Sequence, residues 1–321
     1  MKKTTPANVP ASVAVMAALA TGAAIAAVPA AMAWIFLHPP RRVHLKTPRT
    51  GLGLDYDRFS LRAADGVRLS AWFIPAAASH ATRGVAVLAH GYHGNRHTML
   101  PYVRFLHDAG YAALTFDFRA HGWSGGRRTT FGIDEVHDLH AALDWVFEQP
   151  ELRGLPVALL GESMGASVSL LVAADDERVG AVVADSAFAR FDSAIAGRFH
   201  SVFGKRVSDV IAPPTQRIGE RILGCRGEEI APIEAMPRIA PRPVLLIHGT
   251  ADKLIVPSNA DRLFDASPGN AKLWKVKGAP HVMSVFVAGR EYARRVTEFL
   301  DAALAAPQDA GTGGAGGGAP P

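Results

Sequence analysis

Short apolar runs that alternate with helical patterns constrain the fold of this chain more than any other feature. Five uninterrupted apolar runs, bounded by glycine or polar residues, recur from Gly84 onward: Val85–Ala89, Ala112–Phe116, Val157–Leu160, Val179–Val183 and Val244–Ile247. Runs without polar alternation suit parallel strands that are buried on both faces. Helical patterns separate them, the clearest being Asp134–Phe147. The alternation predicts an α/β fold with a mostly parallel central sheet and helices on both faces.

Two segments depart from this alternation. Tyr56–Leu61 and Val67–Ile74 alternate apolar and polar side chains on either side of the turn signal Ala64-Asp65-Gly66, which predicts an antiparallel hairpin. The segment of about residues 188–239 has no strong strand pattern but contains amphipathic stretches. We interpret it as a small helical cap above the sheet, with an ordinary irregular connection as the alternative.

The strand pattern Val157–Leu160 runs directly into Gly161-Glu162-Ser163-Met164-Gly165, and a helical stretch, Ala166–Ala174, follows. This is the G-x-S-x-G pattern between a strand and a helix, the context in which a serine is presented as a nucleophile. The sharp turn requires glycine, because a side chain two positions before or after the serine would collide with neighbouring backbone. Ser163 is therefore the predicted catalytic nucleophile.

A serine hydroxyl is a weak nucleophile until a base accepts its proton, and a carboxylate must orient that base. With this strand-turn-helix pattern, the order along the chain is serine, acid, histidine. Asp252 lies in the loop after the strand pattern Val244–Ile247, and His281 is the only histidine beyond His248. His248 precedes the acid and so stands in the wrong order. We predict that Asp252 is the acid and His281 the base.

The oxygen of an attacked carbonyl gains negative charge and needs backbone N–H donors. One donor is the residue after the nucleophile, Met164, and the other comes from a loop after an early strand. The run Val85–Ala89 leads into His90-Gly91-Tyr92-His93-Gly94, whose glycines let the loop bend toward the nucleophile. The amides of Tyr92 and Met164 are the predicted oxyanion hole.

Charge and residue content narrow the classes of partner. The chain has 34 basic and 29 acidic residues, a formal charge of +5, and the basic residues are scattered, so we predict no nucleic-acid partner. Cys225 is the single cysteine, which excludes an internal disulfide. The spacing of His90, His93 and His97 resembles that of metal ligands, but that stretch has no acidic residue, and we predict no metal site.

The N-terminal segment is strongly apolar. No charged residue occurs from Val9 to Leu37, a length that spans a bilayer. We predict that residues 1–40 contain a hydrophobic helix that anchors the protein in a membrane by a single pass. One alternative is a signal peptide cut at Ala31-Met32-Ala33, which would leave a secreted or periplasmic protein. Another is a helix buried in the folded domain.

After the N-terminal segment, the chain divides into two predicted regions. Residues 41–305 are the predicted catalytic domain, and residues 306–321, made mostly of Gly, Ala and Pro, are a predicted disordered tail.

From about Gly51 to Leu300 the chain resembles the α/β-hydrolase superfamily, and within it is similar to bacterial membrane-anchored hydrolases of the BEM46-like and prolyl-oligopeptidase-related groups. The motifs that carry the resemblance occur in the family's order: Asp65-Gly66-Val67-Arg68-Leu69-Ser70-Ala71-Trp72, His90-Gly91-Tyr92, Asp117-Phe118-Arg119-Ala120-His121-Gly122-Trp123-Ser124-Gly125, Gly161 to Gly165, the loop of Asp252, and His281. Ala120 stands where many relatives carry glycine. The resemblance implies structural roles for Arg119 and His121.

The resemblance also implies a reaction. It predicts a serine hydrolase, carboxylesterase- or lipase-like, that cleaves small-molecule esters or thioesters through an acyl-enzyme on Ser163 and needs no cofactor. The alternatives are a serine peptidase or aminopeptidase, transfer of the acyl group to an alcohol, and a catalytically inactive, membrane-tethered binding module. Aromatic residues of the cap favour an apolar acyl group, although the same residues fit simple packing of cap helices. No feature points to a particular oligomeric state.

Overall fold

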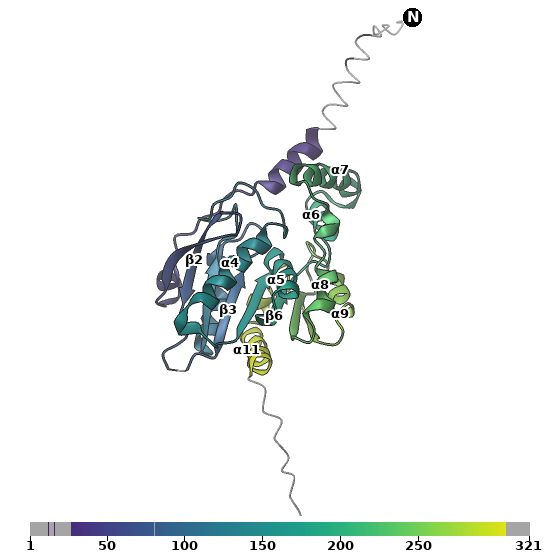
Figure 1. Cartoon of the computed structure of the whole chain (residues 1–321). Coiled ribbons are helices and arrows are strands. Elements are labelled where there is room, and N and C mark those ends of the chain that lie inside the picture. The colour runs from purple at the N-terminus through teal and green to yellow at the C-terminus, as the bar shows by residue number, and fades with distance from the viewer. Residues whose placement is uncertain (1–11, 13–15, 17–26, 80, 306–321) are drawn as a thin grey trace, which may run out of the picture.

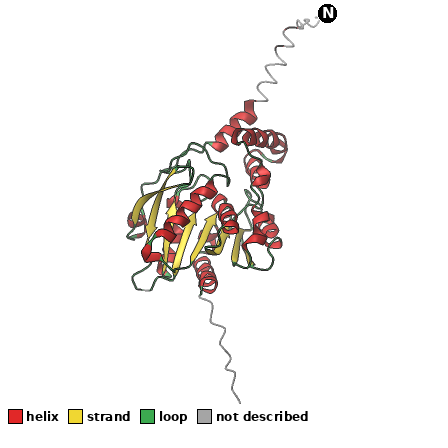
Figure 2. Ribbon diagram, in the orientation of Figure 1, coloured by secondary structure: helices red, strands yellow, loops and turns green. Residues whose placement is uncertain are grey.

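The computed structural model of the protein describes residues 12, 16, 27–79 and 81–305. In this part of the chain, eight strands form one sheet in the order β1-β2-β4-β3-β5-β6-β7-β8 (Figures 1 and 2). The hairpin β1–β2 is antiparallel, β2 pairs antiparallel with β4, and the remaining pairs are parallel. The predicted hairpin and mostly parallel sheet are therefore confirmed.

Seven of the eight described strands follow the segments that the sequence predicts, and residues 271–276 form the additional strand. Their bounds are β1 Asp57–Arg62, β2 Arg68–Ile74, β3 Gly84–Ala89, β4 Tyr111–Phe116, β5 Val157–Glu162, β6 Val179–Asp185, β7 Val244–Gly249 and β8 Ala271–Val276. Every residue of β3, β4, β5 and β7 is buried, as expected for parallel strands covered on both faces.

Helices connect the strands and cover the sheet. The α-helices are α2 Pro48–Leu52, α3 Leu100–Asp108, α4 Glu135–Glu148, α5 Met164–Asp175, α6 Phe191–Phe203, α7 Lys205–Leu223, α8 Pro232–Ile239, α9 Ser258–Asp265, α10 Ser284–Ala288 and α11 Arg290–Leu304. Three short 3-10 helices are η1 Arg96–Met99, η2 Pro150–Leu152 and η3 Gly227–Glu229.

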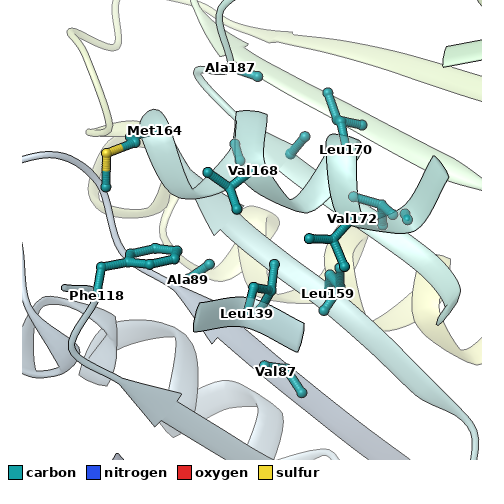
Figure 3. Packing of buried hydrophobic residues seen from close by; sticks show 14 of the residues in the cluster. Val87, Ala89, Phe118, Leu139, Leu159, Met164, Val168, Leu170, Val172 and Ala187 are labelled. Atoms are coloured by element: carbon teal, nitrogen blue, oxygen red, sulfur yellow. The ribbon is translucent and has the colours of Figure 1, made fainter. Parts of the chain in front are cut away.

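Two apolar clusters, one on each face of the sheet, form the core of the described chain. On one face, α4, α5, α8 and α9 pack on the strands through residues such as Leu139, Val168 and Leu263. Figure 3 shows α5 and α4 on this face, with Val168 and Leu139 above Val87 and Leu159 of the sheet. On the other face, α3 and α11 pack through Leu106 and Val296 among others. The sheet is thereby covered by apolar packing on both faces.

The segment after β6 contains helices instead of strands. Helices α6 and α7 pack against each other, whereas α8 packs on α5 in the layer that covers the sheet. The helical pair α6–α7 projects beyond the ends of the strands and lies beside the helix of residues 27–37 (Figure 1). The part of the predicted cap that stands above the sheet is thus α6–α7.

The helix of residues 27–37 packs on the folded domain with one face. Ala33 and Leu37 are buried, and Leu37 belongs to the core cluster that contains α5. The Phe36 ring lies 5.2 Å from the ring of Phe199 in α6. The opposite face of the helix exposes Trp34 and Ile35. The end of the apolar N-terminal segment is therefore part of the domain's packing.

Among the described residues, no helix combines the length and the apolar character needed to cross a bilayer. The predicted hydrophobic helix is not confirmed: most of residues 1–26, where the anchor or signal segment is predicted, lie outside the described residues. The predicted tail, residues 306–321, also lies outside them.

Candidate active site

Strand β5 ends at Glu162 and helix α5 begins at Met164, so Ser163 alone makes the turn between them. Its backbone has φ 52° and ψ −116°, a conformation that residues other than glycine rarely adopt. A side chain on Gly161 would overlap the backbone of Gly165, and one on Gly165 would overlap the carbonyl of Ala89. The glycines are required as the sequence predicted.

The three predicted catalytic side chains form one hydrogen-bonded chain. His281 Nε2 lies 2.8 Å from Ser163 Oγ, and His281 Nδ1 lies 2.7 Å from Asp252 Oδ2. Ser163 and Asp252 each follow a strand, β5 and β7, and His281 follows β8. Because parallel strands end at the same edge of the sheet, residues 118 positions apart in sequence meet at one point.

The environment of Asp252 keeps this carboxylate ionised and fixed. The side chain is fully buried, and its Oδ1 accepts hydrogen bonds from the amides of Leu254 and Ile255, both at 2.9 Å. Burial by itself would raise the pKa of Asp252, but hydrogen bonds from His248 and His281 outweigh it and lower the pKa to about 2. A negative charge is thus held against the imidazole of His281 at any physiological pH.

The loop after β3 lies beside the nucleophile. A Cβ atom added to Gly91 would lie 3.2 Å from the Cβ of Ser163. The amide of Tyr92 donates no hydrogen bond to another described residue, and the Met164 amide, in the first turn of α5, has no carbonyl of its own helix to bond. Both predicted oxyanion donors therefore line the space around Ser163 with free N–H groups.

Glu162, next to the nucleophile, is buried in a polar network that local sequence did not reveal. It accepts a hydrogen bond of 3.1 Å from the hydroxyl of Tyr102. Asp185 lies in the same interior and accepts hydrogen bonds from Ser186 and Tyr292. Burial raises the pKa of Glu162 to about 7, and the charge of Asp185 acts in the same direction.

The motif of residues 117–125 follows β4 and contacts the loop of Tyr92. Arg119 is buried and binds Asp138 of α4, with 2.7 Å between Nη2 and Oδ1. His121 Nε2 accepts a 3.3 Å hydrogen bond from the His93 amide, next to the loop of Tyr92. Ala120 has φ 60°, which explains why a glycine suits this position.

A cavity of about 440 Å³ opens above Ser163 and His281. Its apolar wall includes Phe131, Phe188 and Phe191, and a much smaller apolar cavity of about 30 Å³ adjoins that wall. Two aromatic residues of the predicted cap pocket lie elsewhere: Phe199 packs on Phe36, and Phe203 is exposed. For these two residues the alternative of helix packing applies, whereas Phe188 and Phe191 line the cavity.

Phe36 and Arg42 from the N-terminal segment and Arg198 from α6 line the cavity, and the sequence analysis assigned none of them to the site. They carry no motif, and only the folding of distant segments onto the loop of Tyr92 brings them to the site. The Tyr92 hydroxyl donates a 2.9 Å hydrogen bond to the Phe36 carbonyl, which ties the segment to that loop.

The histidines with metal-like spacing point to different partners. His90 Nε2 accepts a hydrogen bond from the Phe118 amide at 3.0 Å, whereas His97 stacks on His44. No group of three or more potential ligands that could hold a metal ion occurs among the described residues.

Comparison with known proteins identifies the family of this chain. The family described as "Serine aminopeptidase, S33" matches residues 80–220. The chain is 32% identical to the uncharacterized protein YqkD of Bacillus subtilis over 226 residues, 70% of this chain and 73% of YqkD. It is 24% identical to the uncharacterized protein YfhR of Escherichia coli over 274 residues, 84% of this chain and 87% of YfhR.

A solved structure gives the same result. The esterase Pf2001 of Pyrococcus furiosus superposes with a TM-score of 0.71 at 30% identity, covering 84% of this chain and 98% of the esterase. Fold and family together define a hydrolase with an α/β sheet. The chain belongs to the α/β-hydrolase superfamily.

Proposed function

We propose that the protein is a serine hydrolase that cleaves carboxylic esters through an acyl-enzyme on Ser163. The observation that carries the proposal is the unbroken hydrogen-bonded chain from Ser163 through His281 to Asp252 at 2.8 and 2.7 Å. The similarity to the Pyrococcus esterase supports an ester as the substrate.

The proposed reaction has two halves. Ser163 Oγ attacks the ester carbonyl while His281 Nε2 accepts the hydroxyl proton, and the alcohol leaves with that proton. A water then attacks the acyl-enzyme while His281 accepts its proton, and His281 passes that proton to Ser163 Oγ as the acid is released. Asp252 orients the imidazole and stabilises its cation, and the Tyr92 and Met164 amides stabilise the tetrahedral oxyanion.

Hydrolysis of p-nitrophenyl esters from acetate to palmitate tests this proposal. The Ser163→Ala variant should lose at least about 10³-fold in kcat/KM, because residual catalysis then comes from the oxyanion hole and binding alone. A fluorophosphonate should label the wild type and leave Ser163→Ala unlabelled. Turnover retained in a folded Ser163→Ala variant would show that another group is the nucleophile.

A serine peptidase of the same fold is the second candidate, favoured by the description of the matching family. An aminopeptidase must bind a free amino terminus, and a carboxylate facing the substrate is the usual means. Among the described residues that line the cavity, the one carboxylate is Glu162, which is mostly buried and bonded to Tyr102. Aminoacyl p-nitroanilides, assayed beside the esters, compare the two activities directly.

A further inference from the structure

The mouth of the candidate active site carries positive charge without a protein partner. Arg42 and Arg198 both line the cavity that contains Ser163. Arg198 is half-buried and Arg42 exposed. Within the described part of the chain, neither guanidinium forms a hydrogen bond or an ion pair with a carboxylate. A partly buried arginine without a counter-charge is costly, and planar arginines suit carboxylate and phosphate groups.

A histidine lines the cavity together with the two arginines. His93 lies on the same cavity wall, and its Nε2 is buried without a hydrogen-bond partner among the described residues. Burial lowers the pKa of His93 to about 4, and the charges of Arg198 and Arg42 contribute to this lowering. A backbone φ of 64° holds His93 in a conformation that is rare outside glycine. Two cations and a histidine held near its neutral form therefore line the same cavity.

Much of the cavity lining is apolar. Four residues, Phe36, Phe131, Phe191 and Ile195, line both this cavity and the small apolar cavity beside it. An apolar chain and a negative charge can therefore be bound in one site.

We propose that the substrate is an amphiphilic ester that carries a carboxylate or phosphate group, with Arg42 and Arg198 binding this anion beside His93 and the aromatic wall binding the apolar part. This inference rests on the proposed ester hydrolysis and names its substrate class. The charge sets specificity: an anionic ester is preferred over a neutral ester of equal length.

A matched pair of esters tests the inference. p-Nitrophenyl hydrogen adipate and p-nitrophenyl hexanoate have acyl groups of the same length and differ by one terminal carboxylate. The wild type should prefer the adipate ester at low ionic strength, and added salt should reduce the preference. Arg42→Gln and Arg198→Gln should each lower the adipate-to-hexanoate ratio of kcat/KM about tenfold, the effect of losing one charge-assisted hydrogen bond.

The control is Arg206→Gln. Arg206 is an exposed arginine of α7 that does not line the cavity. This substitution removes the same charge from the same helical pair and should leave the ratio unchanged. Equal ratios in all four proteins, together with Ser163-dependent turnover of the hexanoate ester, would overturn the anion site and leave the proposed function standing.

Binding to the Ser163→Ala variant gives a readout independent of turnover. Calorimetric titration should show tighter binding of the adipate ester than of the hexanoate ester, and adding Arg198→Gln should remove the difference. Hexyl phosphate and the free hexanoate anion are then tested as competitors of the adipate ester. The stronger competitor identifies whether phosphate or carboxylate is bound more tightly. Failure of both anions to compete, or equal binding of the two esters, would overturn the inference even if no ester is hydrolysed.

Discussion

At the scale of single residues, the buried carboxyl of Glu162 makes the stability of this protein depend on pH. Burial raises its pKa from an ordinary value of 4.5 to about 7. The native state therefore holds this proton more tightly than the unfolded chain does. Its contribution to stability is fully present below about pH 4.5 and is lost as the pH rises through about 7.

The Glu162→Gln variant should flatten this dependence. Between pH 5 and pH 8, the wild type should lose about 2 kcal/mol more of its free energy of unfolding than the variant does. Urea unfolding across this range measures the difference. Glu151→Gln, at an exposed glutamate, is the control and should follow the wild type. Parallel profiles of wild type and Glu162→Gln would mean that Glu162 is already ionised at pH 5.

At the scale of elements, Arg119 joins three parts of the fold that are distant in sequence. Besides Asp138 of α4, it binds Asp65 in the turn between β1 and β2, with 2.6 Å between Nη1 and Oδ2. The Arg119 side chain is 4% exposed and that of Asp138 is fully buried. The Arg119 side chain thus connects the β1–β2 hairpin and helix α4 to the loop that follows β4.

Arg119→Ala should lower the free energy of unfolding by about 3 to 5 kcal/mol, because it leaves the buried Asp138 without its charged partner. Guanidinium-induced unfolding measures the loss. Arg104→Ala breaks the exposed pair of Arg104 with Asp108 and should cost no more than about 0.5 kcal/mol. A similar, small cost for both variants would contradict the structural role of Arg119.

At the scale of the whole molecule, the boundary between N-terminal segment and hydrolase domain does not fall at residue 40. Phe36 lines the candidate site, and Leu37 is 3% exposed within the main core. The helix of residues 27–37 therefore packs on the folded domain with one face and exposes the other.

A fragment of residues 41–305 should be less stable than one of residues 27–305 by about 3 kcal/mol, the value of burying one or two large apolar side chains. Thermal unfolding compares the two fragments. The shorter fragment should also show a higher KM for long-chain esters, because its cavity lacks the Phe36 wall. Equal melting temperatures and equal KM values would show that the helix contributes neither packing nor substrate contacts.

Local pattern in the sequence was sufficient for seven of the eight described strands, for the elbow at Ser163 and for the order of Asp252 and His281. Strand periodicity and the collision of side chains with adjacent backbone act over a few residues, so they can be read from a short window. The parallel sheet then brings the three residues to one edge, as its topology requires.

Tertiary structure alone decided the rest of the site. Arg42, Arg198 and Phe36 come from an N-terminal segment and a helical pair that meet only through packing, so no spacing in the sequence links them. The pKa of Glu162 likewise depends on burial and on Asp185, which belongs to another strand. Chemistry that depends on neighbours in the chain is visible in the sequence, whereas charge and shape at the substrate cavity arise from contacts between distant segments.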